Sequence, residues 1–186
     1  MLPVKGTASS EASIAVRVCS PDDAQRLGCE YASSWEGQTA GRWDFLTAWS
    51  GPRLVGSACL RWEGPFNEEV AAASPQQVEL GFLHVQPEFR GRGVGTALVG
   101  LAEQRCRERG VTSLGLGVGD GNPRAAALYQ RLGYAATGFR FTDRYTWTNS
   151  DGELQDAVEP GFYLTRHLNS AEARIGGGDG WDRMGA

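Results

Sequence analysis

Apolar and polar residues follow two different periods along this chain, and the two periods alternate. In residues 14–19 every second position is apolar, which predicts a half-buried strand. Similar strand-like runs return further along, separated by stretches in which apolar residues recur every three to four positions, as in a helix. This alternation is typical of an α/β protein. The predicted strands are residues 14–19, 54–62, 78–85, 111–118, 134–148 and 161–168, and the predicted helices are residues 20–33, 39–49, 94–109 and 122–133.

Two of the predicted helices have clear start signals. Ser20 precedes a proline and two aspartates, so it is expected to be the N-cap of the first helix. Asn122 and Pro123 begin the last helix in the same way. The helix over residues 94–109 has an apolar stripe on one face. The residues expected to face outwards from it are Glu103, Gln104, Arg107 and Glu108.

The segments without either period mark the limits of the folded unit. Residues 1–13 are small and polar and are predicted to be disordered, and residues 169–186 are predicted to be a flexible, Gly-rich tail. Residues 14–168 lie between them and are predicted to form one domain, which the chain length of 186 residues also favours. Residues 63–77 and 149–160 are predicted loops.

Charge and hydropathy narrow the functional classes. The formal net charge of −4 argues against a general nucleic-acid binder, which would have a basic face, and agrees better with a cationic partner. No run approaches the ~20 apolar residues that a membrane span requires. The N-terminus has no apolar signal core. We therefore expect a cytoplasmic protein that binds neither nucleic acid nor membrane.

The four cysteines have no close pairing and no metal-binding spacing. We interpret them as reduced, mostly buried thiols, and we predict no metal site. A catalytic cysteine is the alternative, but it would need a histidine partner, and no sequence feature ties His84 or His167 to a cysteine. The cysteines are Cys19, Cys29, Cys59 and Cys106.

Residues 78–101 contain the strongest functional pattern. A strand-like run ends before Pro87, a basic glycine loop follows at residues 90–96, and a helix begins there. Glycines let backbone N–H groups close on an anion, and a helix N-terminus adds its dipole, so this order predicts an anion site. The loop lacks the lysine of a Walker loop, and Thr96 stands where the dinucleotide fingerprint requires a small residue.

Two sequence blocks resemble the GCN5-related N-acetyltransferase (GNAT) superfamily. The pattern of its acetyl-CoA loop, Arg/Gln-x-x-Gly-x-Gly/Ala, is matched by Arg90, Gly93 and Gly95. Its second block, Asn-x-x-Ala-x-x-Leu-Tyr-x-x-Leu-Gly-Phe/Tyr, is matched at the expected distance by Asn122, Ala125, Leu128, Tyr129, Leu132, Gly133 and Tyr134. The resemblance is close over residues 78–138. It implies the GNAT fold, α/β (α+β), with a central, mixed, mostly antiparallel sheet of about six to seven strands, helices on both faces, and a splay between strands 4 and 5.

The resemblance also implies acetyl-CoA as co-substrate. Backbone N–H groups of the glycine loop would hold its pyrophosphate. A bulge near the end of the strand over residues 78–85 would free backbone donors for the pantetheine arm and the thioester carbonyl. Asn122 would contact the pantetheine amides, cap its helix, or do both, and the side chains of Arg90 and Arg92 would pair with the outer phosphate or stay solvated. The expected cofactor-binding residues are Leu83, His84, Val85, Arg90, Gly91, Arg92, Gly93, Val94, Gly95, Thr96, Asn122 and Tyr129.

The predicted strand over residues 111–118 has one face without side chains, because every second residue in its second half is glycine. So bare a strand loses stability, and the expected reason for it is close approach of the pantetheine chain. The alternative is that this face packs under a helix. The glycines are Gly115, Gly117 and Gly119.

The resemblance implies two catalytic residues. Tyr129 matches the general acid of the family. A phenol with a pKa near ~10 can protonate a departing thiolate and still stay protonated itself at neutral pH. The alternative for Tyr129 is a core tyrosine. Some members have a glutamate as base on the fifth strand, where this chain has Gly117, so the candidate base is Glu79, which matches the fourth-strand glutamate of histone-type members. Burial would raise its pKa as a base requires, and the alternative is a solvent-facing strand residue.

The expected reaction is direct transfer of acetyl from acetyl-CoA to a primary amine of a small molecule. The alternatives are a protein or peptide amine, and a non-catalytic acyl-CoA sensor, although the presence of Tyr129 and Glu79 favours an enzyme. A homodimer is compatible with each of these, and residues 63–77 are a candidate flap over the acceptor site. Acidic and aromatic residues that could receive a cationic acceptor are Trp35, Glu36, Trp43, Asp44, Glu63, Glu68, Glu69, Asp143 and Tyr145.

Overall fold

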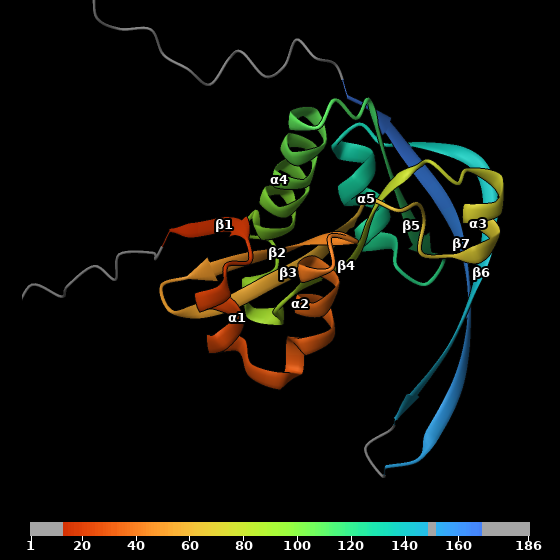
Figure 1. Ribbon diagram of the computed structural model, residues 1–186. Helices are drawn as coiled ribbons and strands as arrows, with labels where there is room; N and C mark the ends of the chain where they lie inside the picture. The colour runs from red at the N-terminus through yellow and green to blue at the C-terminus, as the bar shows by residue number, and fades with distance from the viewer. Residues whose placement is uncertain (1–12, 149–151, 169–186) are drawn as a thin grey trace, which may run out of the picture.

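Seven strands form one sheet, and helices cover both of its faces (Figure 1). The computed structural model describes residues 13–148 and 152–168. The strands are β1 (Ile14–Val18), β2 (Trp43–Ser50), β3 (Arg53–Arg61), β4 (Val78–Val85), β5 (Ser113–Gly119), β6 (Ala135–Thr148) and β7 (Leu154–His167). The helices are α1 (Pro21–Leu27), α2 (Ala32–Thr39), α3 (Glu68–Ala73), α4 (Val94–Glu108) and α5 (Pro123–Arg131), with the short 3-10 helices η1 (Gly28–Tyr31) and η2 (Pro87–Phe89).

The strand order is β1-β2-β3-β4-β5-β7-β6, and every neighbouring pair is antiparallel except β4 and β5. Two parallel strands need a crossover connection, and α4 provides it. The predicted mixed, mostly antiparallel sheet is therefore confirmed. The far ends of β6 and β7 continue as a long hairpin that projects away from the body of the molecule (Figure 1).

The main core lies between the sheet and the pair α4 and α5. Leu98, Ala102 and Cys106 on the apolar stripe of α4 are completely buried in it. A second cluster on the other face joins α1 and α2 to the sheet around Phe45, and Figure 1 shows these two helices on the opposite side of the sheet from α4. The prediction of helices on both faces is confirmed, because both faces of the sheet need an apolar cover.

Glu103 departs from the predicted outward face of α4, and that part of the prediction is wrong. The residue is 5% exposed. Tyr134 donates a hydrogen bond to its carboxylate at 3.2 Å, and Arg166 of β7 donates at 2.8 and 3.0 Å. Since β7 is distant in sequence, the helical pattern alone could not predict that Arg166 packs against Glu103.

The predicted helix starts at Ser20 and Asn122 are confirmed. The Ser20 hydroxyl accepts a hydrogen bond from the Asp23 N–H at 3.1 Å, and the Asp23 carboxylate accepts one from the Ser20 N–H at 3.2 Å. The Asn122 side chain accepts a hydrogen bond from the Ala125 N–H at 3.1 Å. Both signals depend only on neighbouring residues, so they can be recognised without the fold.

The helix predicted over residues 39–49 is wrong. Helix α2 ends at Thr39, and the following segment forms β2. All six interior residues of β2 are buried, including the polar residues Asp44 and Thr47. With both faces buried, the strand lacks the alternation that would distinguish it from a helix. The predicted helix over residues 20–33 is also interrupted, because Gly28 adopts a φ of 69° between α1 and α2.

Two predicted loops are shorter than expected. Residues 63–77 contain α3, whose start is capped by the Asn67 side chain and whose Val70 is buried. Strand β7 begins at Leu154, because its first half pairs with β6 in the projecting hairpin, where no apolar face is required. The predictions for residues 1–12 and 169–186 lie outside the described residues.

Three cysteines have described side chains, and all are free and buried. Burial raises the pKa of the Cys19 and Cys59 thiols to about 11 and that of Cys106 to about 12, so they stay protonated. In the described ranges, no helix combines the length and apolar character needed to cross a membrane. Across those same ranges, no group of three or more His, Cys, Asp and Glu side chains is placed to hold a metal ion.

Candidate active site

Strands β4 and β5 separate soon after they meet. Their parallel ladder consists of the pairs Val78–Leu114 and Glu79–Gly115. Beyond Glu79, the backbone groups on this edge of β4 have no ladder partner on β5. The predicted splay between strands 4 and 5 is therefore confirmed.

Strand β4 also contains a bulge on the side of β3. Cys59 lies opposite Gly81 and Ser57 lies opposite His84, so β4 uses one residue more than β3 over this stretch. Phe82, inside the bulge, has a φ of 53°, which is uncommon for a residue with a side chain. The bulge lies just beyond Glu79, where the ladder between β4 and β5 ends.

A cleft of about 840 Å³ opens where the strands separate. Its walls come from β4, the glycine loop, β5 and α5, with Glu159 of β7. Arg92 is not among its lining residues, and its guanidinium lies 5.5 Å from the centre of the Phe89 ring. The other expected cofactor-binding residues line this single cleft: Leu83, His84, Val85, Arg90, Gly91, Gly93, Val94, Gly95, Thr96, Asn122 and Tyr129.

The glycine loop leads directly into the N-terminus of α4. Gly91 and Gly93 have φ values of 77° and 83°, which residues with side chains rarely adopt. Gly93 is the N-cap and has no side chain, so the N–H groups of the first turn have no side-chain cap. The Arg90 side chain donates a hydrogen bond to the Val85 carbonyl at 3.1 Å, which ties the loop to the end of β4.

Three charged residues of the cleft wall were not among the predicted site residues. Arg124 and Arg131 come from α5, and Glu159 comes from β7. The two arginines are seven positions apart, so they share one side of the helix, and this spacing could have identified them. Glu159 gave no such signal, because its segment was interpreted as a loop.

The bare face of β5 is covered by side chains of the last two strands. A Cβ atom on Gly115 would collide with the Tyr163 hydroxyl, and one on Gly117 would lie 2.9 Å from the Phe141 ring. Aromatic side chains of the last two strands thus make a close approach to this face, and no helix contacts it at Gly115 or Gly117. Gly117 and Gly119 also line the cleft, so the approach of the pantetheine chain to this end of the face stays a prediction.

Tyr129 lies in the cleft wall on α5. Only 6% of the residue is exposed, and burial raises its pKa to about 12. Its ring packs edge-on against Tyr134, with 5.9 Å between the ring centres. The Tyr134 hydroxyl is directed to Glu103. Of these two neighbouring tyrosines, Tyr129 is the one that lines the cleft.

Glu79 lies at the vertex where β4 and β5 separate. It is 5% exposed, which excludes the solvent-facing alternative. The Tyr163 hydroxyl donates a hydrogen bond to its Oε2 at 2.8 Å. Burial is the main influence on the carboxyl group and raises its pKa to about 7, against the opposite effect of this hydrogen bond. The cleft itself begins at the next residue, Leu80.

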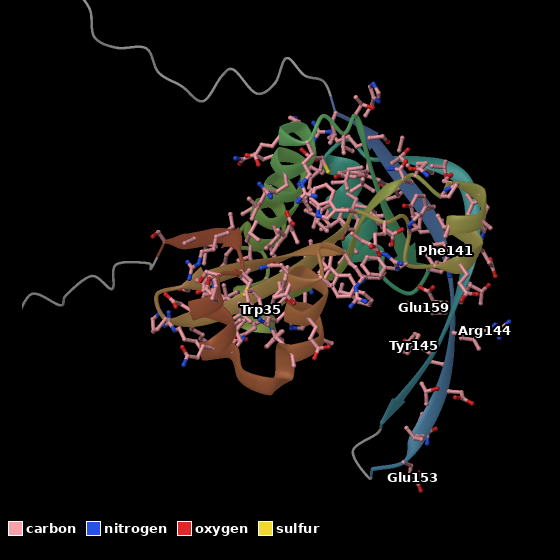
Figure 2. The ribbon with its side chains drawn as sticks, in the orientation of Figure 1. Trp35, Phe141, Arg144, Tyr145, Glu153 and Glu159 are labelled. Atoms are coloured by element: carbon pink, nitrogen blue, oxygen red, sulfur yellow. The ribbon has the colours of Figure 1, made fainter. Side chains whose placement is uncertain are left out.

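The residues proposed as acceptor walls are not gathered in one place. Trp35 lines a separate cavity of about 440 Å³ beside α1 and α2. Asp44 pairs with an arginine of α4 at 2.9 Å. Figure 2 shows Tyr145 on the projecting part of the hairpin, where it is 50% exposed. Asp143 lies close enough to Glu79 for its charge to raise the pKa of that carboxyl group.

A model of the Acetyltransferase (GNAT) family matches residues 14–134. The match includes the splayed strands, the glycine loop and the helix with Tyr129. The chain therefore belongs to this family.

Individual relatives are similar over part of their length. N-acetyltransferase 8 of Rattus norvegicus is 32% identical over 103 residues, or 55% of this chain and 44% of that protein. The chain spans less than half the length of the curated relatives it matches. A ribosomal-protein-alanine N-acetyltransferase from Brucella melitensis shares the fold, with a TM-score of 0.60 and 21% identity over 83% of this chain and 99% of that one. A nourseothricin acetyltransferase is 29% identical, with a TM-score of 0.51 over 70% of this chain and 68% of that one.

Proposed function

We propose that this chain is an acetyl-CoA-dependent N-acetyltransferase that acts on a primary amine of a small molecule. The amine would attack the thioester directly while both substrates are bound. The observation that carries this proposal is the cleft at the splay, because it unites the glycine loop, the bulged β4 and Tyr129 in one cavity. Membership of the GNAT family supports the same reaction class.

The cleft fits acetyl-CoA in charge and in hydrogen-bonding groups. Arg90, Arg124 and Arg131 in its wall suit the phosphates, next to the uncapped N–H groups of α4. The free edge of β4 offers backbone groups to the amides of the pantetheine arm. When bound, acetyl-CoA supplies the acetyl group as a thioester. The volume of the cleft lies within the usual range for small-molecule sites.

Tyr129 is the residue that we assign as general acid. Its pKa of about 12 keeps the hydroxyl protonated at neutral pH. A thiol has a pKa of about 8.5, so the leaving thiolate accepts a proton readily from a nearby donor. The position of Tyr129 in the cleft wall supports this role.

Glu79 is the residue that we assign as general base. With a pKa of about 7, it can accept a proton from the attacking amine near neutral pH. Glu79 lies just outside the cleft lining, so a bridging water would carry the proton to it.

The acceptor class rests on less specific observations. A small-molecule amine is favoured because the nourseothricin acetyltransferase, at 29% identity, is named for a substrate other than a protein. Glu159 adds a carboxylate to the cleft wall, which suits a cationic acceptor. A protein amine is the second candidate, because the structurally similar Brucella enzyme is named for the alanine of a ribosomal protein.

The proposed function is tested first by acetyl-CoA binding, measured by calorimetry. A free-thiol assay on the same preparation would then compare polyamines, aminoglycosides, amino acids and basic peptides. Thiol release with one small-molecule class supports the proposal, and release with peptides alone supports the second candidate. Binding without turnover would identify an acyl-CoA sensor, and absence of binding would refute the assignment of the cleft.

Replacement of Tyr129 by Phe tests the general acid. Tyr129→Phe keeps the ring contact with Tyr134 but removes the proton donor, so we expect kcat to fall by about 100-fold. The Kd for acetyl-CoA should stay close to that of the wild type, because the hydroxyl acts on the departing sulfur. Single-turnover kinetics and calorimetry measure the two effects separately. An unchanged kcat would remove Tyr129 from the mechanism.

A further inference from the structure

The proposed base, Glu79, accepts a buried hydrogen bond that has no role in the proposed reaction so far. The Tyr163 hydroxyl donates a hydrogen bond to Glu79 at 2.8 Å, and the two residues are 3% and 5% exposed. Water has little access to this hydrogen bond. The Tyr163 ring therefore fixes the orientation of the carboxylate, and solvent cannot take over this function.

The glycine of β5 beside this hydrogen bond has a specific reason to lack a side chain. A Cβ atom on Gly115 would lie too close to the Tyr163 hydroxyl oxygen for both to be accommodated. Gly115 is also the ladder partner of Glu79, and their pair is the last one before the strands separate. One residue from each of β4, β5 and β7 thus meets at this point, namely Glu79, Gly115 and Tyr163. The cleft begins at the next residue of β4, Leu80.

We propose that Tyr163 is a positioning residue, which holds the Glu79 carboxylate at the vertex of the splay in the space that Gly115 leaves open. This inference rests on the proposed role of Glu79 as the base. The hydroxyl donates to one oxygen of the carboxylate, Oε2. A tyrosine also remains a donor across the working pH range, because burial and the neighbouring carboxylate raise its own pKa.

The charged groups around Glu79 come from two elements, β3 and β6. Arg61 faces Glu79 from β3, and its positive charge lowers the pKa of the carboxyl group. Asp143 of β6 lies near it, and its negative charge raises that pKa. Tyr163 comes from β7 and Gly115 adds no charge from β5. The Phe66 backbone N–H also favours the ionised form. Among these groups, the Tyr163 hydroxyl makes the strongest contribution in favour of the ionised carboxylate.

The test is a direct titration of Glu79 by NMR on protein labelled with ¹³C at the glutamate carboxyl carbon. The signal of Glu79 is assigned by its loss in Glu79→Gln. Removal of a hydrogen bond to the ionised form raises a carboxyl pKa, so we expect the Glu79 midpoint in Tyr163→Phe to rise by about one pH unit. The matched control is Tyr134→Phe, which removes the same kind of hydrogen bond from Glu103 and should leave the Glu79 midpoint unchanged.

A second pair of variants keeps every tyrosine. Gly115→Ala pushes the Tyr163 hydroxyl away and should raise the Glu79 midpoint in the same direction. Gly117→Ala makes the same change two residues further along, where the Cβ meets Phe141. It should leave the Glu79 midpoint unchanged. Equal midpoints in the wild type, Tyr163→Phe and Gly115→Ala would overturn the inference.

Kinetics separate a positioning function from a structural one. In Tyr163→Phe the acid limb of the kcat/KM profile should move to higher pH by the same amount as the NMR midpoint, and the high-pH plateau should be retained. An equal loss of activity at every pH would mean that Tyr163 only supports the fold. If the wild-type protein releases no thiol with any amine, the proposed function fails, and the NMR midpoint still decides whether Tyr163 sets the ionisation of Glu79.

Discussion

Two glutamates of this protein, Glu79 and Glu103, are buried to the same extent, each with 5% of its surface exposed. Each accepts a hydrogen bond from a buried tyrosine, Tyr163 for the first at 2.8 Å and Tyr134 for the second at 3.2 Å. They differ in their cationic neighbours. Glu103 receives two hydrogen bonds from Arg166, at 2.8 and 3.0 Å, and it is ion-paired on two sides.

Glu79 has an arginine nearby but no ion pair with it. Arg61 lies opposite on β3, but its guanidinium stacks over the Phe66 ring at 5.0 Å, and no ion pair joins it to Glu79 among the described residues. No ion pair therefore offsets the unfavourable burial of the ionised carboxylate, and the pKa of Glu79 rises to about 7. Two carboxylates buried to the same extent thus differ in their ionic partners. The absence of a paired cation leaves Glu79 able to gain and lose a proton near neutral pH, whereas Glu103 joins α4 to β7.

The largest expected difference between the two glutamates is in turnover. Glu79→Gln should lower kcat/KM at neutral pH by about 1000-fold, equivalent to about 4 kcal/mol, because glutamine cannot accept the proton. The comparison variant is Glu103→Gln, which should leave kcat of the folded protein near the wild-type value. Thiol release under saturating acetyl-CoA measures both. Similar losses in the two variants would show that the base lies elsewhere.

The next effect is on stability and concerns the arginines. Arg166→Met should lower the free energy of unfolding by about 2 to 3 kcal/mol, because it leaves a buried carboxylate with less ionic compensation. Arg61→Met, the equivalent change opposite Glu79, should cost about 1 kcal/mol or less, since it removes a ring contact and no ion pair. Urea unfolding at neutral pH compares them. Equal losses would contradict the distinction drawn between the two sites.

The smallest effect is the pH dependence of stability at Glu79. Its pKa of about 7 in the folded protein lies above the value of about 4.3 in an unfolded chain, so the protonated carboxyl stabilises the fold at low pH and this contribution is lost as the pH rises through 7. Glutamine stays neutral throughout. The stability of Glu79→Gln relative to the wild type should therefore increase by about 2 kcal/mol between about pH 5.5 and pH 8. A constant difference over this range would mean that the Glu79 pKa is close to its ordinary value.

The sequence was sufficient where a structure depends on neighbouring residues. The glycine loop, the caps at Ser20 and Asn122, and the position of Tyr129 all follow from short motifs. They could be predicted because backbone conformation and capping are decided within a few residues.

The environments of the two glutamates could not be predicted in this way. Glu103 was placed outside because the stripe of α4 gives no information on what packs over its flank, and its partner Arg166 comes from β7, 63 positions later. The hydrogen bond from Tyr163 to Glu79 spans 84 positions. Contacts over such distances are decided by the strand order, which places β7 beside β5 and so brings Arg166 and Tyr163 to these glutamates.

The two-pair ladder between β4 and β5 has a consequence for how the protein unfolds. Strands β1 to β4 and strands β5 to β7 form two halves that share few backbone hydrogen bonds, whereas the apolar side chains of α4 and α5 pack with both. Backbone hydrogen bonds across the centre of the sheet are thus too few to make the two halves unfold together. Cooperativity between them must come from side-chain contacts, chiefly those of the shared apolar core. We therefore expect a cavity made in α4, for example at Leu98, to weaken the coupling and broaden the unfolding transition.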